Sequence, residues 1–331
     1  MKKLLFLCLA TIVALHSFAQ KGQEELKKAN AAFENHLYTE AASWYEKAAE
    51  QGHAVAQYNL GVCYAHGNGV SQDYKQAVYW WEKAAAQGYA EAQYNLGVCY
   101  EYGYGVSQDY KQAVYWYEKA AEQGLADAQY NLAFCYDNGY GVSQDYKQAV
   151  YWYEKAAKKG HAEAKYWLDK AAEQGDAEAQ YSLAVVSKDY KQAVYWWEKA
   201  AEQGHAKAQY NLAYCYAYGY GVRQDYKQAV YWYEKAAEKG LVEAQYELGD
   251  CYASGDGVSK DYKQAVYWYE KAAEQGHAEA QYDLGRYYEY GNGVSKDIKK
   301  AKYWYEKAAE QGDESARHKL ERLEEESLEE D

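Results

Sequence analysis

The stretch HAVAQYNLGVCYAHGNGVSQDYKQAVYWWEKAAAQG, from His53 to Gly88, decides the fold, because near-copies of it fill most of the chain. The glycine that closes the stretch recurs every 36 residues, at Gly52, Gly88, Gly124 and Gly160. A fixed period in this range is typical of solenoid proteins, in which each repeat packs on its neighbours. Function must then come from a surface that several repeats share, or from positions at which the copies differ.

Each copy predicts two amphipathic helices joined by a glycine-rich turn. Apolar residues follow helical spacing in the first half, around Leu60, and in the second half, around Trp81. The turn at 67–70 breaks the first helix. We expect Asp73 to cap the second helix through its side-chain oxygen, and Gly88 to end that helix in the left-handed conformation.

The copies also predict how the chain is organised. We expect a signal peptide at 1–19, a capping hairpin at 20–52, three full repeats at 53–160, two shortened repeats at 161–204, three full repeats at 205–312 and an acidic capping helix at 313–331. The two shortened repeats interrupt the alternation of first and second helices. A kink in the array near 160–187 is therefore predicted.

The first 19 residues have the three-part pattern of a secretory signal. Two lysines precede the apolar run at 4–15, and Ser17 and Ala19 are the small residues that a signal peptidase requires, with cleavage before Gln20. The alternative is an uncleaved membrane anchor, although the run is short for a spanning helix. No other segment could cross a membrane. The sequence predicts an exported protein, periplasmic or secreted, with no integral membrane segment after cleavage.

The charge restricts the choice of partners. The formal net charge is -14, and loss of Lys2 and Lys3 with the signal peptide makes it -16. An acidic exported chain is a poor candidate for binding nucleic acid or anionic lipid. Partners with basic or polar, uncharged surfaces fit better.

Five cysteines remain after cleavage, and they occupy one repeat position: Cys63, Cys99, Cys135, Cys215 and Cys251. A disulfide ladder is one interpretation for an exported protein. However, equivalent helices in adjacent repeats lie about 8–10 Å apart, whereas disulfides need Cα atoms within about 7 Å. We therefore expect free, mostly buried thiols.

The repeat closely resembles the Sel1-like repeat, a relative of the tetratricopeptide repeat with a longer internal turn. The resemblance rests on Ala56, Tyr58, Leu60, Gly61, Tyr64, Gly67, Gly69, Val70, Asp73, Ala77, Trp80, Ala84, Ala85 and Gly88. It covers about 53–312, and the capping hairpin at 20–52 looks like a tetratricopeptide unit. The resemblance implies an all-α, right-handed α–α superhelical solenoid that acts mainly as an adaptor. Some cysteine-rich relatives bind penicillin-type compounds through arrays with paired cysteines, at positions that this chain does not reproduce.

No catalytic motif, cofactor-binding motif or metal-binding motif occurs in the sequence. Four histidines open first helices, and whole repeats separate most of them, too far apart to converge on one metal: His53, His161, His205 and His277. Recurring Glu–Lys pairs such as Glu82–Lys83 indicate a solvated outer face. The sequence thus predicts a protein that is not an enzyme and holds neither cofactor nor metal.

The resemblance to tetratricopeptide modules implies that the first helices line a concave groove. The residues expected on this face, and offered to a partner, are Tyr58, Asn59, Val62, His66, Asn95, Val98, Tyr102, Asn131, Phe134, Asn211, Tyr214, Glu247, Asp250, Asp283 and Arg286. Tetratricopeptide modules use an asparagine at the Asn59 position to hold a carboxylate, but the basic residues that assist it there are missing here. A consensus role for this asparagine is the alternative.

The groove positions change in chemistry along the chain. The Val62 position becomes Val98, Phe134, Tyr214, Asp250 and Arg286, and the Asn59 position becomes Ser182, Glu247 and Asp283 in later repeats. Glu243, Glu279 and Glu289 add acidic residues to the late repeats. We expect the groove to bind an extended polypeptide whose basic residues lie toward the C-terminal end of the array.

Rows of tyrosines form a second candidate surface: Tyr79, Tyr115, Tyr151, Tyr195, Tyr231, Tyr267 and Tyr303, with Tyr102, Tyr104, Tyr140, Tyr218 and Tyr220 in or near the turns. Tyrosine is enriched at interfaces and also stacks on sugar rings; simple duplication of a helix-compatible residue is the alternative. The sequence therefore predicts a non-enzymatic scaffold that binds a protein or peptide. Two other functions stay open: a glycan- or peptidoglycan-associated binding protein, and an enzyme of the penicillin-binding kind.

Overall fold

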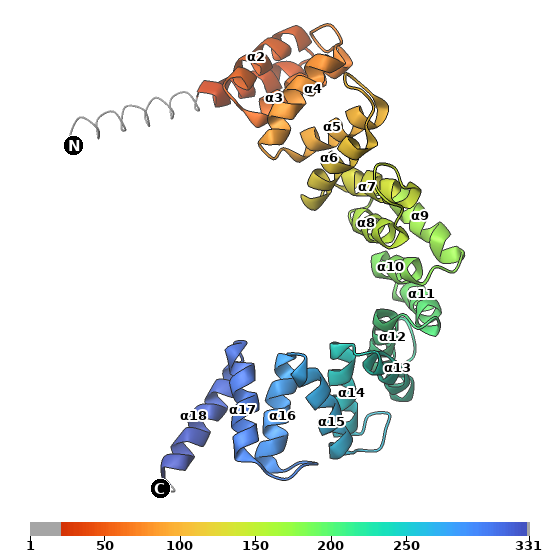
Figure 1. The fold of residues 1–331 in the computed structure, drawn as a ribbon, viewed down its shortest axis with the longest axis vertical. Helices are drawn as coiled ribbons and strands as arrows, with labels where there is room; N and C mark the ends of the chain where they lie inside the picture. Colours follow the sequence, from red (N-terminus) through yellow and green to blue (C-terminus); the bar gives the residue numbers. More distant parts are fainter. Residues whose placement is uncertain (1–20, 330–331) are drawn as a thin grey trace, which may run out of the picture. The chain divides into compact units, whose positions relative to one another are not determined.

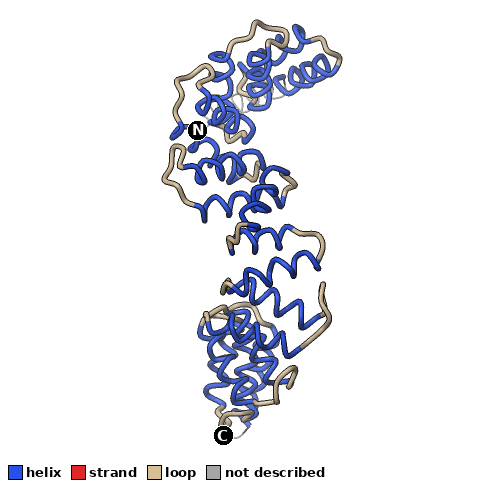
Figure 2. The backbone as a smooth tube through the Cα atoms, turned by 90° about the vertical axis from the view of Figure 1, so that its right-hand side faces the viewer, coloured by secondary structure: helices blue, strands red, loops and turns tan. Residues whose placement is uncertain are grey.

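The structure is a computed structural model that describes residues 21–329. Within this range the regular elements are helices, as Figure 2 shows. The chain is an all-α solenoid of helical hairpins, which confirms the fold class that the repeat period predicts. The predicted signal peptide at 1–19 lies outside the described residues.

Each repeat forms one hairpin of a first and a second helix (Figure 1). The first helices are α3 (Ala54–His66), α5 (Ala90–Tyr102), α7 (Ala126–Asn138), α10 (Ala177–Val186), α12 (Ala206–Tyr218), α14 (Val242–Ser254) and α16 (Ala278–Tyr290). The second helices are α4 (Tyr74–Ala86), α6 (Tyr110–Glu122), α8 (Tyr146–Lys158), α11 (Tyr190–Glu202), α13 (Tyr226–Glu238), α15 (Tyr262–Glu274) and α17 (Ile298–Glu310).

Four further helices complete the described chain. A helix at 21–34 and α2 (Tyr38–Glu50) precede the first full repeat, α9 (Ala162–Glu173) lies between α8 and α10, and α18 (Glu314–Glu329) follows α17. The chain divides into two compact units, up to Trp167 and from Leu168 onward. We call them unit 1 and unit 2. The predicted kink near 160–187 stays a prediction.

Local chemistry sets the helix ends as expected. The Asp73 carboxylate caps α4 by accepting from the backbone N–H groups of Lys75 (2.8 Å) and Gln76 (3.2 Å). Gly88 follows α4 with a φ of +88°, a left-handed conformation that costs glycine little. These signals repeat in each full copy, which explains why every full repeat makes the same hairpin.

The glycine-rich turn also packs one repeat on the one before it. In unit 1, Gly105 has a φ of +72°, and a Cβ at this position would overlap the backbone of Tyr74 at the start of α4. The neighbouring Tyr104 ring stacks on the Tyr74 ring, with 5.1 Å between centroids. The turn is thus an inter-repeat contact as well as a connection.

The core is built from alanines that let the helices approach and from aromatic rings that pack between the helices. Tyr117 and Tyr153 in unit 1, and Tyr233 and Tyr305 in unit 2, are at most 1% exposed. At the end of unit 2, α18 packs on α17 and buries Leu323 (5% exposed). Burial of this apolar surface is the main source of stability in such a stack.

Candidate protein-binding surface

The residues expected to face a partner lie on the first helices, some in unit 1 and some in unit 2. We call these positions the first-helix surface of each unit. The exposed members are His66, Tyr102, Phe134, Tyr214 and Arg286. The half-buried members are Tyr58, Asn59, Val62, Asn95, Val98, Asn131, Asn211, Glu247, Asp250 and Asp283. No contact observed here tests whether these residues bind a partner, so that role stays a prediction.

The recurring asparagine links adjacent repeats. Burial raises the pKa of Tyr58, and a side-chain hydrogen bond with Asn95 of the next repeat opposes the shift. The Tyr94 hydroxyl and Asn131 form the same pair one repeat later. This link supplies a structural reason for the asparagine to recur, besides any contact with a ligand.

Acidic side chains hold several of the buried tyrosines. The Tyr117 hydroxyl donates to Glu101 (2.5 Å) in unit 1, and the Tyr305 hydroxyl donates to Glu289 (2.6 Å) in unit 2. A buried hydroxyl with such a partner avoids the cost of an unmade hydrogen bond. Glutamates at this repeat position therefore act within the scaffold.

Glu289, which the sequence places among the acidic groove residues, is instead 5% exposed and neutralised. It forms ion pairs with Lys319 and Arg322 of α18, besides accepting from Tyr305. The expectation that it adds to an acidic groove is wrong, because α18 folds over it with two cations. Local sequence patterns could not predict this contact, because the partners lie 30 or more residues away.

Asp283 is likewise engaged by neighbours. Its carboxylate pairs with Arg286 (2.8 Å) one turn along α16 and accepts from the Tyr246 hydroxyl (3.3 Å) of the preceding repeat. Two of the predicted groove residues, Asp283 and Arg286, thus compensate each other's charge. Toward the C-terminal end of the array, the acidic character of the first-helix surface is therefore concentrated on α14.

Glu247 and Asp250 of α14 line one cavity of about 470 Å³ in unit 2. Burial, followed by the charge of Asp250, raises the pKa of Glu247 to about 6. Burial also raises the pKa of Asp250, although the Tyr269 hydroxyl donates to its carboxylate (2.5 Å). The structure brings these two predicted residues together with Tyr218, an exposed ring at the end of α12.

Exposed aromatic rings gather beside this cavity. The Tyr214 and Tyr218 centroids are 4.4 Å apart, and Tyr220 in the following turn lies 6.0 Å from Tyr214. These three side chains, which we call the α12 aromatic cluster, are 38%, 54% and 41% exposed. In unit 1, Phe134 and Tyr140 occupy the positions of Tyr214 and Tyr220, with 5.9 Å between their rings.

The tyrosine rows on the second helices are covered differently. A lysine four residues later places its Nζ over the ring at 4.8 Å for Tyr79, 5.0 Å for Tyr115 and 4.9 Å for Tyr231. Such cation–π contacts occupy the ring face that a sugar would need for stacking. The rows are therefore less available than their exposure implies.

A row of buried glutamines is the contact that sequence reasoning missed. In each case the side-chain amide donates to a backbone carbonyl eight residues earlier, as Gln57 does to Ala49 (3.1 Å). In several full repeats its oxygen then accepts from a glutamine thirty residues later, as Gln57 does from Gln87 (2.8 Å). In a shortened repeat, Gln180 accepts from Gln203 (2.8 Å), which lies 23 residues later. The available signal was the recurrence of glutamine at the first position in every repeat that forms a hairpin and at the second position in most of them.

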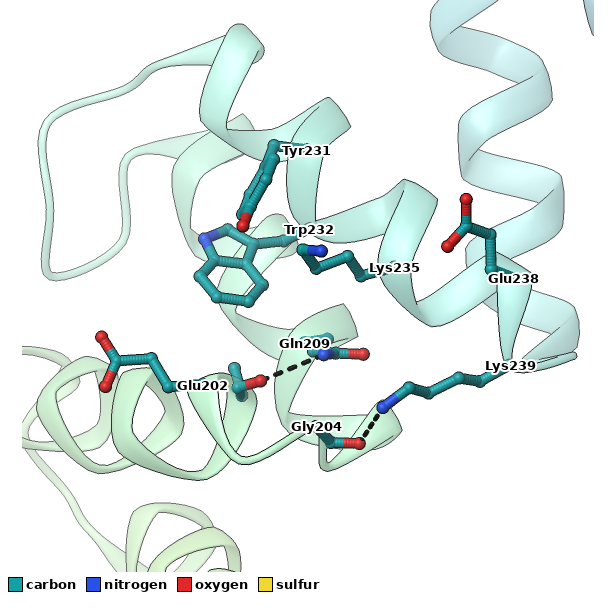
Figure 3. Close-up of a pocket in the computed structure, with 9 residues that line it drawn as sticks. Glu202, Gly204, Gln209, Tyr231, Trp232, Lys235, Glu238 and Lys239 are labelled. Atoms are coloured by element: carbon teal, nitrogen blue, oxygen red, sulfur yellow. Dashed lines mark hydrogen bonds between the residues drawn. The ribbon is translucent and has the colours of Figure 1, made fainter.

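Figure 3 shows where this row is interrupted in unit 2. Lys239 stands where the other repeats mostly have glutamine, and its ammonium group binds the Gly204 carbonyl. The Gln209 amide still donates to Ala201 (3.0 Å), but its buried oxygen has no partner among the described residues. Lys159 in unit 1 leaves the Gln129 oxygen in the same state.

The described cysteines form no disulfide, and one of the histidines expected to open a first helix makes local contacts within the scaffold. All five cysteines in the described chain are free thiols, as expected, and burial raises the pKa of Cys63 to about 11. His205 accepts from the Ala208 backbone N–H (3.1 Å) at the start of α12 and stacks on Tyr181. Within residues 21–329 no group of histidine, cysteine and acidic side chains is arranged to hold a metal ion.

None of the described helices is long and apolar enough to cross a membrane.

Stacked helical hairpins that share their buried residues and differ on the first-helix surface define a helical-repeat protein. Nine segments match the Sel1 repeat, at residues 36–53, 54–89, 90–125, 126–161, 162–176, 177–205, 206–241, 242–277 and 278–313. The chain therefore belongs to the Sel1 repeat family. Proteins of this family generally mediate protein–protein interactions, and their solenoid fold is typically non-enzymatic.

Solved structures of related proteins cover most of the chain. A Sel1 repeat protein from Oxalobacter formigenes is 33% identical over 96% of this chain and 93% of its own, with a TM-score of 0.46. A protective antigen present in uropathogenic Escherichia coli strains is 30% identical over 95% and 90%, with a TM-score of 0.41. Among curated proteins, DAP3-binding cell death enhancer 1 of Rattus norvegicus is 50% identical over 36 residues, which are 11% of this chain and 7% of that protein.

Proposed function

We propose that this chain is a non-enzymatic scaffold that binds a polypeptide on the first-helix surface. The α12 aromatic cluster carries the proposal: Tyr214, Tyr218 and Tyr220 are exposed and lie together. Exposed aromatic rings gathered on one patch are enriched at protein interfaces, because they bury a large area with little loss of side-chain entropy. The family's general role in protein–protein interaction supports the same conclusion.

The chemistry of the surface indicates which polypeptide would fit. Beside the α12 aromatic cluster, Glu247 and Asp250 present carboxylates that form no ion pair with a described residue. A polypeptide with basic residues opposite α14 and apolar or aromatic residues opposite α12 would match both features. We propose such a partner.

We also propose that the chain is exported, to the periplasm or beyond. The support is the pattern at 1–19, which lies outside the described residues. Mass spectrometry of the protein purified from its native cell tests this proposal. A mature chain that begins at Gln20 supports it, and an intact N-terminus that begins at Met1 contradicts it.

The other two functions receive no support from the described residues. A glycan site on the tyrosine rows would have to displace lysines such as Lys83 and Lys235 from the ring faces. A penicillin-binding activity would rest on relatives with paired cysteines, whereas the cysteines described here are free.

Site-specific crosslinking tests the scaffold proposal. A photoreactive residue would replace Tyr218 in the α12 aromatic cluster or, as a control, Tyr231 on α13, which is 46% exposed. We expect a protein to be captured in the native cell through position 218 and much less through position 231. The captured protein, once purified, should bind wild-type chain at least about tenfold more tightly than Tyr214→Ser/Tyr218→Ser, because hot-spot aromatic residues cost more than 1 kcal/mol when truncated.

The matched control is Tyr231→Ser/Tyr267→Ser, which removes two tyrosines of similar exposure from second helices of the same unit. Equal losses for the two double variants would contradict binding on the first-helix surface. Capture through position 231 alone would contradict it as well.

A further inference from the structure

The cavity in unit 2 lies beside a position at which this repeat has alanine and two other repeats have glutamate. Ala217, at the end of α12, occupies the position of Glu101 and Glu289, which accept hydrogen bonds from the buried tyrosines of their repeats. Alanine leaves that space empty. The cavity is about 470 Å³, and its lining combines Ala217 with residues of α13, α14 and the turn that follows α14.

Tyr233 of α13 lines this cavity and lacks the partner that Tyr117 and Tyr305 have. Its side chain is 1% exposed, and its buried hydroxyl has no hydrogen-bond partner among the described residues. A buried hydroxyl without a partner costs about 1–3 kcal/mol. Tyr233 is thus an unsatisfied polar group that a ligand in the cavity could satisfy.

Two carboxylates of α14 also line the cavity. Glu247 stands where four of the other repeats have asparagine, and Asp250 stands where the preceding repeats have an apolar or aromatic residue. No lysine or arginine is among the lining residues described, and the other acidic member, Asp256, accepts from Ser254 (2.8 Å). The cavity therefore has an uncompensated negative charge together with an unpartnered phenol.

A cation would match the negative charge of this lining. The arrangement of the lining residues favours a guanidinium group over an ammonium group. A guanidinium is planar, donates several N–H bonds at fixed angles and stacks on aromatic faces, whereas an ammonium is a compact point charge. The rings of Tyr218 and Tyr226 border the cavity and supply such faces. Within the described chain, no group of side chains is arranged to hold a metal ion instead.

We infer that this cavity receives an arginine side chain of the bound polypeptide, with Glu247 and Asp250 accepting from its N–H groups and the Tyr233 hydroxyl accepting a further one. The inference rests on the proposed function and adds to it a single anchoring position, on α14 of unit 2. Asp250 keeps its bond from Tyr269, since a carboxylate has several acceptor sites.

Defined peptides test the inference on the full chain. The probes are acetyl-Gly-Gly-Arg-Gly-Gly-amide and two analogues that carry citrulline or lysine in place of arginine, followed by calorimetry or NMR titration up to about 10 mM. We expect the arginine peptide to bind at least about tenfold more tightly than either analogue. Citrulline lacks the positive charge, and lysine lacks the planar set of N–H donors that a guanidinium group has. Equal affinity for citrulline, or no binding of the arginine peptide, overturns the inference; equal affinity for lysine overturns the guanidinium assignment.

Three variants locate the site. Glu247→Asn installs the residue of sister repeats, so folding should be retained, and we expect about a tenfold loss of affinity for the arginine peptide. Ala217→Glu restores the side chain that fills this space elsewhere, and we expect a similar loss. Glu238→Gln removes an exposed carboxylate on α13 that does not line the cavity, and binding should stay within about twofold.

Equal losses for Glu238→Gln and Glu247→Asn would show a response to overall charge alone and would overturn the inference. The experiments distinguish failure of this inference from failure of the proposed function. If the captured partner still depends on Tyr214 and Tyr218 while arginine peptides do not depend on Glu247, only the cavity assignment is lost.

Discussion

A Cβ atom on Gly97 of α5 would lie 2.5 Å from Cδ1 and Cε1 of Tyr117, because the ring packs directly on the glycine backbone. The Tyr117 hydroxyl then reaches Glu101. The same position is glycine in α3, α14 and α16. In each of these repeats the aromatic residue that packs on the glycine also has a hydrogen-bond partner. Trp81, for example, donates to the backbone carbonyl of Tyr58.

The position is alanine in the three remaining repeats, and there the aromatic residue is unsatisfied. Ala133, Ala184 and Ala213 accompany Tyr153, Trp197 and Tyr233, whose buried polar atoms have no partner among the described residues. The repeats thus fall into two packing states that differ by one methyl group on the first helix and by the partner available to the aromatic ring.

Gly97→Ala should lower the stability of unit 1. Alanine normally favours a helix interior over glycine by about 1 kcal/mol, but the added methyl group overlaps the Tyr117 ring, and overpacking costs about 1–3 kcal/mol. We expect a net loss on the order of 1 kcal/mol, measured by urea denaturation followed by circular dichroism. The control is Ala133→Gly, which creates space rather than overlap; a gain in stability for Gly97→Ala would contradict the packing account.

Tyrosine-to-phenylalanine substitutions should separate the two states. Tyr117→Phe removes the hydrogen bond to Glu101 and should cost about 1–2 kcal/mol. Tyr233→Phe removes a hydroxyl that has no partner among the described residues and should be neutral or stabilising. Thermal unfolding of both variants tests this difference, and a larger loss for Tyr233→Phe than for Tyr117→Phe would count against it.

Lys239→Gln should stabilise unit 2 by about 0.5–1.5 kcal/mol, the usual net value of one hydrogen bond. Glutamine at this position gives the Gln209 oxygen a donor and can keep the bond to the Gly204 carbonyl, as Gln87 does with Gln57 and the Gly52 carbonyl. Denaturation curves measure the change.

The reverse substitution in the same unit, Gln203→Lys, breaks the bond to the Gln180 oxygen and should destabilise by a similar amount. Changes of the same sign in both variants would show that the glutamine row does not contribute as described.

The stability of unit 2 should depend on pH through Glu247. Its pKa rises from 4.5 to about 6 on folding, so the folded protein holds this proton more tightly than the unfolded chain does. The resulting stabilisation is complete below about pH 4.5 and is lost as the pH rises through about 6. We expect wild type to lose on the order of 1 kcal/mol relative to Glu247→Gln between pH 4.5 and 7, after allowance for solvent screening.

The measurement is the free energy of unfolding of both proteins across this pH range. Other titrating groups largely cancel in the difference. A difference that stays constant with pH, or that changes in the opposite direction, would show that Glu247 is not held in its protonated form by burial.

Much of the fold could be predicted because its signals are local. The spacing around Leu60 and Trp81 predicts the helix pair, Asp73 predicts the cap, and the glycine period predicts the stack. The candidate site could be predicted only as a set of positions. Whether a carboxylate on the first-helix surface is free depends on partners from other helices, which is why Glu289 was assigned wrongly and Glu247 was not distinguished from Asp283.

The sequence by itself determined the hairpin, its period and the family, because spacing, caps and glycines act within one repeat. Tertiary structure alone decided which buried hydroxyl groups have a partner. Helices α6 and α13 have the same sequence, YKQAVYWYEKAAE, yet the Tyr117 hydroxyl is bonded and the Tyr233 hydroxyl is not. The physical reason is that the partner comes from another helix: Glu101 fills the space in one repeat, and Ala217 leaves it open in the other.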